Sequence, residues 1–248
     1  AAAAADERVK LTMDTGALDS RIRLLTEMEK DYEGFNKAVK LVCQAKGELR
    51  GIHGPVASLI KTESRYSLAI EIALGAGLQN IVVDREEDAK SAIAFLKRRD
   101  GGRATFLPLT AIHGEELREN GVEREFGFVG VASRLVCFDP KYTQIFNNLL
   151  GRTVIAEDLD CGIAMARKYR NAFRIVTLDG QVINRGGSMT GGSVSRSAGV
   201  LSRTAELERL NSRIGELHQR LEDAKVAEAA AGRELEAARY ELTTAEAQ

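Results

Sequence analysis

The sequence predicts a mixed α/β (α+β) domain of two similar lobes, flanked by an antiparallel coiled coil that the two ends of the chain form together. Apolar residues recur at heptad spacing near both ends, whereas glycine and β-branched residues become frequent between about residues 50 and 195. A weak internal repeat divides this middle region. The predicted boundaries are an N-terminal arm at 1–49, a first lobe at 50–112, a connector at 113–126, a second lobe at 127–200 and a C-terminal arm at 201–248.

The C-terminal arm has the clearest pattern. Its apolar residues alternate steps of three and four, interrupted only at Glu228, and they are Leu207, Leu210, Ile214, Leu217, Leu221, Ala224, Ala231, Leu235, Ala238, Leu242 and Ala245. No proline occurs after Val200. At ~1.5 Å per residue such a helix extends roughly 70 Å, and its apolar stripe needs a partner helix.

The N-terminal arm offers that partner. Heptad positions are filled by Leu11, Thr15, Leu18, Ile22 and Leu25, and after one shortened step by Met28, Tyr32, Phe35, Val39 and Val42. Gly16 and Gly34 weaken this helix relative to the C-terminal one. Because one chain leaves and re-enters the middle region, we expect the two arms to pair antiparallel. The alternative is two separate surface helices on a globular core.

The internal repeat predicts two βαβ-like units. Residues 73–109 and 147–180 each contain an apolar strand, an acidic helix start, an amphipathic helix with a basic end and a second strand. In this alignment Ile81, Val82 and Val83 correspond to Val154, Ile155 and Ala156. Acidic residues favour a helix N-terminus and basic residues its C-terminus. The middle region is therefore predicted to have two pseudo-symmetric lobes.

Composition excludes several functional classes. The net charge of −1 shows that the chain as a whole is not a basic nucleic-acid binder, so any such role must be local. No apolar run approaches about 18 residues, and the first residues lack the pattern of a signal peptide. Cys43, Cys137 and Cys161 are far apart and odd in number, which favours a reducing cytoplasm and small buried side chains.

Metal and catalytic motifs are absent from the sequence. The histidines His53, His113 and His218 are isolated, and there is no C-x-x-C pair. We expect His218 to face solvent on the arm and His53 to have a structural role. The sequence therefore predicts no catalytic residue, no metal ligand and no cofactor within this chain.

A glycine-rich segment follows the last predicted strand of the second lobe. It reads NRGGSMTGGSVSR and contains Gly186, Gly187, Gly191 and Gly192. It lacks the lysine of a P-loop, the spacing of a dinucleotide fingerprint and the final glycine of a nucleophile elbow. A flexible linker is one alternative. We favour a surface where another backbone lies close, because glycine has no side chain to hold backbones apart.

Basic residues gather in two places. One group lies in the segment LKRRDGGR at the end of the predicted helix of the first lobe and contains Lys97, Arg98, Arg99 and Arg103. The other lies near the start of the C-terminal arm and contains Arg185, Arg196 and Arg203. One interpretation is a solvated helix end that complements the helix dipole. The other is contact with DNA phosphates without sequence preference.

Several segments together resemble the hinge of a bacterial or archaeal structural maintenance of chromosomes (SMC) protein. They span about residues 34–193 in order, and they read GFNKAVKLV, GIHGPVASLI, AIEIALGAGLQNIVVD, DAKSAIAFLK, GRATFLPL, NLLGRTVIAEDLD and RIVTLDGQVINRGGSMTGGS. The heptad arms on both sides are also typical of this family.

The resemblance implies a function in chromosome condensation and segregation. In this family two hinges dimerise, the arms form antiparallel coiled coils, and an ATPase head that binds ATP and magnesium lies at the far end. The glycine motif at the dimer interface carries over to Gly186, Gly187, Gly191 and Gly192. The resemblance also implies DNA-contacting basic residues, which carry over to Lys97, Arg98, Arg99, Arg196 and Arg203. The implied partners are a second copy of the chain and DNA, at the nucleoid in the cytoplasm and without a membrane.

Two other functions remain open at this point. One is a nucleotide- or phosphate-binding enzyme built on the βαβ-like units. The other is the coiled-coil hook of a DNA repair ATPase, which requires a C-x-x-C zinc pair that this sequence lacks. Because no Walker A motif is present, the chain itself is predicted not to be an enzyme.

Overall fold

The computed structural model describes residues 2–193 and 199–247, so the predicted DNA contact Arg196 lies outside the described residues. The chain forms two compact units. One contains the residues up to Lys30 together with those from Glu206 onward, and the other contains Asp31–Ala205. In the described part of the chain, no helix is long and apolar enough to cross a membrane.

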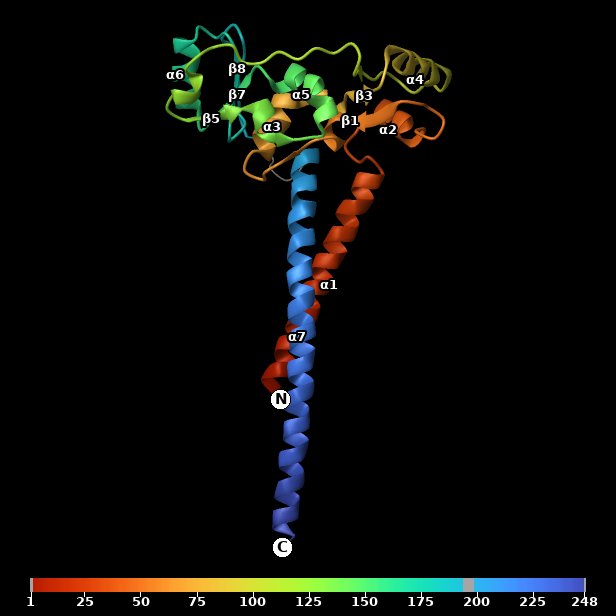
Figure 1. Cartoon of the computed structure of the whole chain (residues 1–248), viewed down its shortest axis with the longest axis vertical. Coiled ribbons are helices and arrows are strands. Elements are labelled where there is room, and N and C mark those ends of the chain that lie inside the picture. Colours follow the sequence, from red (N-terminus) through yellow and green to blue (C-terminus); the bar gives the residue numbers. More distant parts are fainter. Residues whose placement is uncertain (1, 194–198, 248) are drawn as a thin grey trace. The chain divides into compact units, whose positions relative to one another are not determined.

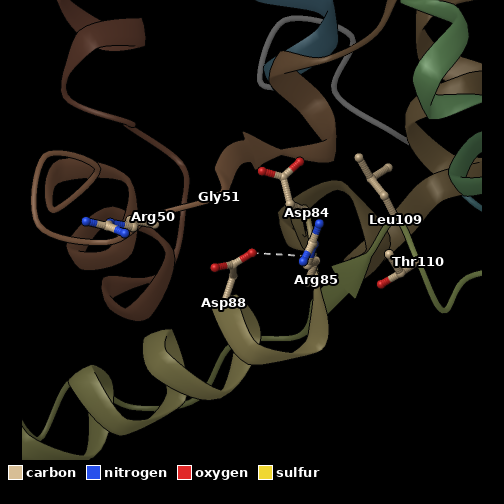
Figure 2. A pocket seen from close by; sticks show the side chains of 7 residues that line it. All are labelled: Arg50, Gly51, Asp84, Arg85, Asp88, Leu109 and Thr110. Atoms are coloured by element: carbon tan, nitrogen blue, oxygen red, sulfur yellow. Dashed lines mark hydrogen bonds between the residues drawn. The ribbon is translucent and has the colours of Figure 1, made fainter.

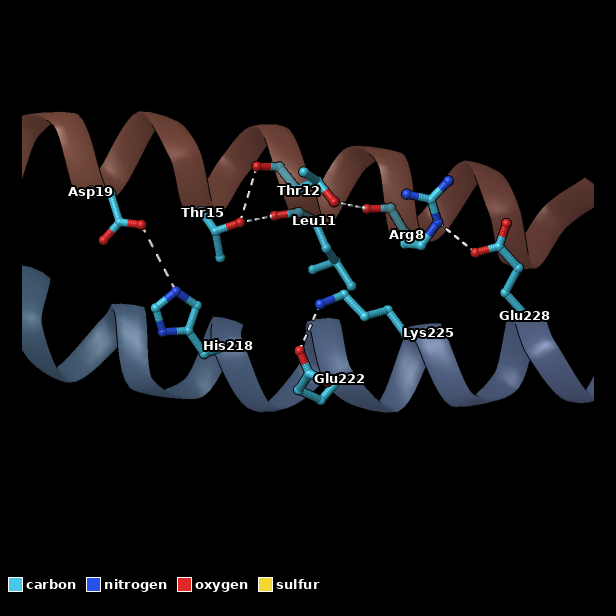
Figure 3. Close-up of polar contacts among 9 residues, drawn as sticks. All are labelled: Arg8, Leu11, Thr12, Thr15, Asp19, His218, Glu222, Lys225 and Glu228. Atoms are coloured by element: carbon cyan, nitrogen blue, oxygen red, sulfur yellow. Dashed lines mark hydrogen bonds and ion pairs between the residues drawn. The ribbon is translucent and has the colours of Figure 1, made fainter.

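The arm unit is an antiparallel pair of helices, α1 (Ala2–Lys30) and α7 (Val200–Glu246) (Figure 1). Its seam contains the buried residues Leu11, Thr15, Leu25, Leu210, Leu217 and Leu221. Ion pairs join Arg8 to Glu228 and Arg21 to Glu206, so the two helices run in opposite directions. Figure 3 shows the seam residue Leu11 between such polar contacts. The antiparallel coiled coil is therefore confirmed.

The predicted continuation of the N-terminal arm beyond Lys30 is wrong. The helix α1 is followed by a turn, and in this turn Tyr32 and Gly34 have φ angles of 50° and 91°. A separate helix, α2 (Lys37–Gln44), begins after the turn. The apolar face of α2, including Val39 and Val42, packs against Ile81 and Phe95 in a core of the other unit. Heptad-like spacing predicts an apolar helix face but does not identify the partner that covers it.

The first lobe of the middle unit contains one βαβ unit with its surroundings. Its elements are β1 (Ile52–Pro55), η1 (Val56–Ser58), β2 (Lys61–Thr62), α3 (Ser67–Leu74), η2 (Gly75–Gln79), β3 (Ile81–Val83), α4 (Glu86–Arg98) and β4 (Phe106–Pro108). The strands form a sheet of order β1-β3-β4, in which β3 and β4 are parallel. The helix α4 connects them, as the sequence predicts.

The second lobe repeats this order and then extends it. Its elements are η3 (Val122–Arg124), β5 (Phe128–Val131), η4 (Ala132–Arg134), β6 (Val136–Cys137), η5 (Pro140–Tyr142), α5 (Thr143–Leu150), β7 (Thr153–Ala156), α6 (Leu159–Lys168), β8 (Arg174–Thr177), β9 (Val182–Ile183) and β10 (Met189–Thr190). The sheet order is β10-β9-β8-β7-β5, with β7 parallel to β8. Figure 1 shows α4 and α6 at opposite ends of the unit, with α3 and α5 between them.

The repeat is accurate to single residues. Val82 lies opposite Gly54 of β1, and Ile155 lies opposite Gly130 of β5. Both pairings contain an irregularity at the same place, just before that glycine. This confirms the predicted correspondence of residues 81–83 with 154–156.

The lobes share one core. A cluster of buried residues includes Val82 of the first lobe and Ile155 of the second, and β2 pairs with β6 across the lobes. The guanidinium of Arg174 in β8 also donates to the carbonyl of Ala73 at the end of α3, at 2.7 Å. The division into two lobes and a connector therefore remains a sequence prediction, because residues 31–205 form a single compact unit.

Candidate functional site

The glycine-rich segment forms a β-hairpin at the margin of the five-stranded sheet. The backbone N–H of Asn184 donates to the carbonyl of Ser188 at 2.8 Å, and that of Gly187 donates to the carbonyl of Asn184 at 2.9 Å. Gly186 and Gly187 have φ angles of 87° and 93°, which glycine adopts without steric cost. These two glycines therefore make the turn of the hairpin, a local reason for their presence that sequence reasoning did not identify.

The second glycine pair meets a side chain of its own chain. A Cβ atom on Gly191 would lie 2.2 Å from Oε1 of Gln181, and the N–H of Gly192 donates to the same oxygen at 2.9 Å. The amide of Gln181 also donates to the carbonyl of Gly192 at 3.3 Å. Gln181 thus holds the end of β10 in place, and no sequence motif indicated this role. The four predicted glycines lie together on one hairpin, while their role at an interface remains a prediction.

This arrangement gives no support to the nucleotide-binding alternative. A phosphate-binding glycine loop connects a strand directly to the N-terminus of a helix. Here the glycines lie in and after a strand-to-strand turn, between β9 and β10. No group of three or more metal-ligating side chains occurs among the described residues.

The strand β10 is an exposed sheet edge. Among the described residues it pairs with β9 alone, and both Met189 and Thr190 are exposed, Met189 to 51%. Because Ser188 uses its carbonyl toward β9, the alternation of strand geometry directs the N–H and C=O of Met189 away from the sheet. The edge has no lysine, proline or bulge of the kinds that usually prevent edge-to-edge pairing.

The strand β4 is the corresponding edge of the first lobe. Thr105 accepts from Ile81 and Leu109 donates to Val83, so the backbone groups of Phe106 and Pro108 between them point away from β3. Proline lacks an N–H, and its occurrence here is typical of an edge position. Each lobe thus has an open sheet edge, β4 in the first and β10 in the second.

The predicted basic cluster lies at the C-terminal end of α4. Lys97, Arg98 and Arg99 are exposed, and the guanidinium of Arg99 lies 5.1 Å from the centre of the Phe95 ring. The ammonium of Lys37 in α2 donates to the carbonyl of Asp100 at 3.3 Å, which adds a cation from a distant part of the sequence. The position of Lys37 beside this cluster could not be predicted from the spacing of residues in the sequence.

Arg203 lies in a different environment from this cluster. It is partly buried in the first turn of α7, and its guanidinium donates to the carbonyl of Glu33 at 2.6 Å. Next to it, Glu71 of α3 accepts from the backbone N–H of Val200 at 3.1 Å, although burial raises the pKa of this carboxyl. The structure therefore gives Arg203 a packing role at the start of the arm, and its predicted contact with DNA remains untested.

A pocket lies at the carboxyl ends of the parallel strands β3 and β4. It has a volume of about 620 Å³, and Figure 2 shows its lining residues Arg50, Gly51, Asp84, Arg85, Asp88, Leu109 and Thr110. Asp88 accepts from the backbone N–H of Arg85 at 3.1 Å and so caps α4. Beside the pocket, the hydroxyl of Thr110 donates to Glu86 at 2.6 Å and lowers the pKa of that carboxyl.

The remaining candidate side chains have structural positions. Nε2 of His53 lies 2.8 Å from Asp84 and Nδ1 lies 2.9 Å from the Tyr142 hydroxyl, so this histidine links the two lobes. Cys43 and Cys161 are buried as expected, but Cys137 is exposed, which corrects the prediction for that residue. Cys137 belongs to the short strand β6, which pairs only with β2.

The family model for the SMC proteins Flexible Hinge Domain matches residues 49–166. Chromosome partition protein Smc of Bacillus subtilis is 45% identical over 205 residues, which are 81% of this chain and 17% of that protein. Its counterpart in Methanocaldococcus jannaschii is 42% identical over 193 residues, which are 78% of this chain and 16% of that protein.

Two solved structures resemble the whole chain. The asymmetric dimer of the Geobacillus stearothermophilus SMC hinge domain has a TM-score of 0.83 and 38% identity, and the match covers 94% of this chain and 98% of that one. The Pyrococcus furiosus Smc hinge domain with an extended coiled coil has a TM-score of 0.55 and 26% identity, and the match covers 99% and 94%. The chain therefore matches hinge structures almost end to end, but it spans only about a sixth of the full-length relatives.

Proposed function

This chain belongs to the hinge family of SMC proteins, and on that premise we propose that it joins two copies of itself through the open edge of β10. The observation that carries the proposal is an exposed edge strand of two residues without lysine, proline or bulge, placed next to a glycine hairpin. The related hinge domain of Geobacillus stearothermophilus forms an asymmetric dimer, which supports self-association of the hinge.

The two larger sheets end in β1, β4, β5 and β10, and we propose that β10 of one copy adds to β4 of the other. A two-fold axis then generates this contact twice. In one contact β10 of the first copy meets β4 of the second, and in the other β4 of the first copy meets β10 of the second. Main-chain hydrogen bonds from Met189 and Phe106 supply the pairing. Gly191 and Gly192, which carry no side chains, let the second backbone approach.

Dimerisation of this kind serves a larger assembly. The related full-length proteins are named chromosome partition proteins, and we propose the same process for the protein to which this chain corresponds. An ATPase head with ATP and magnesium, a cytoplasmic location and association with the nucleoid belong to that proposal.

The substitution Met189→Pro tests the dimer. It removes an N–H that points away from the sheet, so the hairpin keeps its internal hydrogen bonds with Asn184 and Gln181. We expect sedimentation at micromolar concentration to find a dimer for the wild-type chain and mainly monomer for the variant. A wild-type monomer, or a variant that dimerises with unchanged affinity, would contradict the proposal. The circular dichroism of the variant serves as the folding control.

DNA contact by the basic end of α4 is the second part of the proposed function. Lys97, Arg98 and Arg99 are exposed, and Lys37 extends the same surface. Phosphate contacts of this type have little sequence preference and weaken steeply with salt. Their position beside a helix C-terminus is also compatible with the dipole alone.

Charge reversal of Lys97, Arg98 and Arg99 tests that contact. We expect weaker DNA binding and a salt slope reduced by about three, because each lost phosphate contact reduces the slope by roughly one. A triple reversal at the exposed arm residues Arg209, Arg233 and Arg239 changes net charge equally and is the matched control. Equal affinity and salt slope for both variants would exclude a DNA site at this helix end.

A further inference from the structure

We propose that Arg185 of one copy lies against the acidic end of the first lobe of the other copy, and that this contact determines how the two edges join. The inference rests on the proposed dimerisation through β10. It follows from the direction of the two edge strands and from the charges at their ends, which the next paragraphs take in turn.

The direction of β10 is known from its neighbours. Since β9 is antiparallel to both β8 and β10, β10 runs parallel to β8. Its beginning therefore lies near the end of α6, where a Cβ on Gly187 would be 3.3 Å from the side chain of Asn171. Its end lies near the turn after β8, where Gln181 donates to Asp179 at 3.4 Å.

The two ends of β10 carry opposite charge. Arg185 is exposed in the hairpin turn, and Arg170 precedes Asn171 in the neighbouring loop. At the other end Asp179 is exposed. Within the part of the chain that the structure describes, an approaching strand therefore meets positive charge at the beginning of β10 and negative charge near its end.

The edge strand β4 carries charge in the same order along the chain. The exposed Arg103 precedes it, close in sequence to the basic end of α4. After β4, Thr110 donates to Glu86, and this end of the lobe contains the carboxylates of Asp84, Glu86, Glu87 and Asp88. Arg50 and Arg85 balance the two carboxylates that line the pocket, Asp84 and Asp88 (Figure 2). The exposed Glu86 and Glu87 next to the pocket leave this end of the lobe acidic.

Antiparallel pairing of β10 with β4 places opposite charges together at both ends. Arg185 lies in the turn that precedes β10, and Thr110 lies in the turn that follows β4, so antiparallel pairing of the two strands brings these two turns to the same end of the joined sheet. Arg185 then reaches the carboxylate of Glu86, which Thr110 already contacts. Parallel pairing would instead bring Arg185 to Arg103, and like charges at an interface are unfavourable.

A charge-swap experiment tests this arrangement. We expect Arg185→Glu and Glu86→Lys each to weaken homodimerisation about tenfold, because each variant places like charges together at two symmetric sites. An equimolar mixture of the two variants restores both contacts only in the mixed dimer. Native mass spectrometry should therefore find mixed dimers well above the statistical half of all dimers. The double variant Arg185→Glu with Glu86→Lys should recover most of the wild-type affinity.

Other outcomes separate this inference from the proposed function. A statistical mixture with unchanged affinities would overturn the Arg185 contact and leave dimerisation through β10 intact. Rescue of Arg185→Glu by Asp179→Arg, but not by Glu86→Lys, would show instead that β10 pairs with β10. A wild-type monomer would remove both proposals. Arg134→Glu, at an arginine that is 72% exposed in η4, is the control for a general effect of charge.

Discussion

The two lobes of the middle unit have the same order of strands and helices, but their sheets end in different strands. Each contains a strand with an irregularity before a glycine, a buried central strand and a parallel partner reached through one helix. The second lobe then adds β9, β10 and the glycine hairpin, whereas the first ends its sheet at β4. The shared part forms the core, and the part that differs supplies the edge that we propose for dimerisation.

A second difference concerns the residue just before the first strand of each lobe. Gly51 and Gly127 both adopt positive φ angles, of 66° and 73°, just before the first strand of their lobes. A side chain on Gly51 would meet the carboxylate of Asp88, and one on Gly127 would meet the thiol of Cys161, which is buried. The same backbone conformation is thus packed against a movable polar group in one lobe and a core residue in the other.

The largest effect is expected from truncating the equivalent central residues. Ile155→Ala should lower the free energy of unfolding by about 2–5 kcal/mol, and Val82→Ala by about 2–3 kcal/mol, because both side chains are fully buried. Since one core contains both residues, denaturant unfolding of residues 31–205 should remain a single transition for either variant. Separate transitions for the two lobes would show that they are independent in stability.

Alanine at the two positive-φ glycines sharpens the comparison of the lobes. Gly127→Ala should cost about 2–3 kcal/mol, since it combines backbone strain with a clash against buried Cys161. Gly51→Ala should cost about 1–2 kcal/mol, because the side chain of Asp88 can turn away and only its cap on α4 is lost. Thermal denaturation measures the loss of stability in both variants. An equal loss would mean that the buried neighbour Cys161 adds no packing cost beyond the backbone strain that both positions share.

Glu119 offers a test of the connector by pH. Burial by itself would raise the pKa of Glu119, but the hydrogen bond from Arg152 at 2.7 Å and two backbone N–H groups hold it below its ordinary value. A lowered pKa means that this group stabilises the fold above its unfolded pKa and loses that effect as pH falls through the folded pKa. Glu119→Gln should cost about 0.5–1 kcal/mol at pH 7 and almost nothing in strong acid. A cost independent of pH would contradict this assignment.

Glu71 should show the opposite pH dependence, with the smallest effect. Because its pKa is raised, the folded protein holds the proton more tightly, and the contribution of Glu71 to stability falls as pH rises from the ordinary value through the raised one. The free energy of unfolding of Glu71→Gln, relative to that of the wild type, should therefore increase by about 0.5 kcal/mol as pH rises from 4 to 7. This figure is small because the side chain is only partly buried. Denaturant titration across this range measures it, and a relative loss would contradict the sign.

Much of the architecture was predictable from residue patterns. Heptad spacing identified both arm helices, and the repeat aligned Val82 with Ile155 before any register was known. The same spacing failed beyond Lys30, because Val39 and Val42 satisfy an apolar face against α4 as well as they would against α7. Periodicity reports that a face is buried, whereas the covering element depends on contacts distant in sequence.

The glycine segment illustrates the remaining limit. The sequence by itself determined that residues 186–192 lack the lysine of a P-loop and the glycine spacing of a dinucleotide fingerprint. Only the tertiary structure decided that the segment ends a sheet, that Gln181 holds its last glycines and that Arg203 is packed against Glu33. Local motifs depend on neighbouring residues, but sheet edges and side-chain contacts such as that of Gln181 form where segments distant in sequence meet. Their position is therefore a property of the assembled fold.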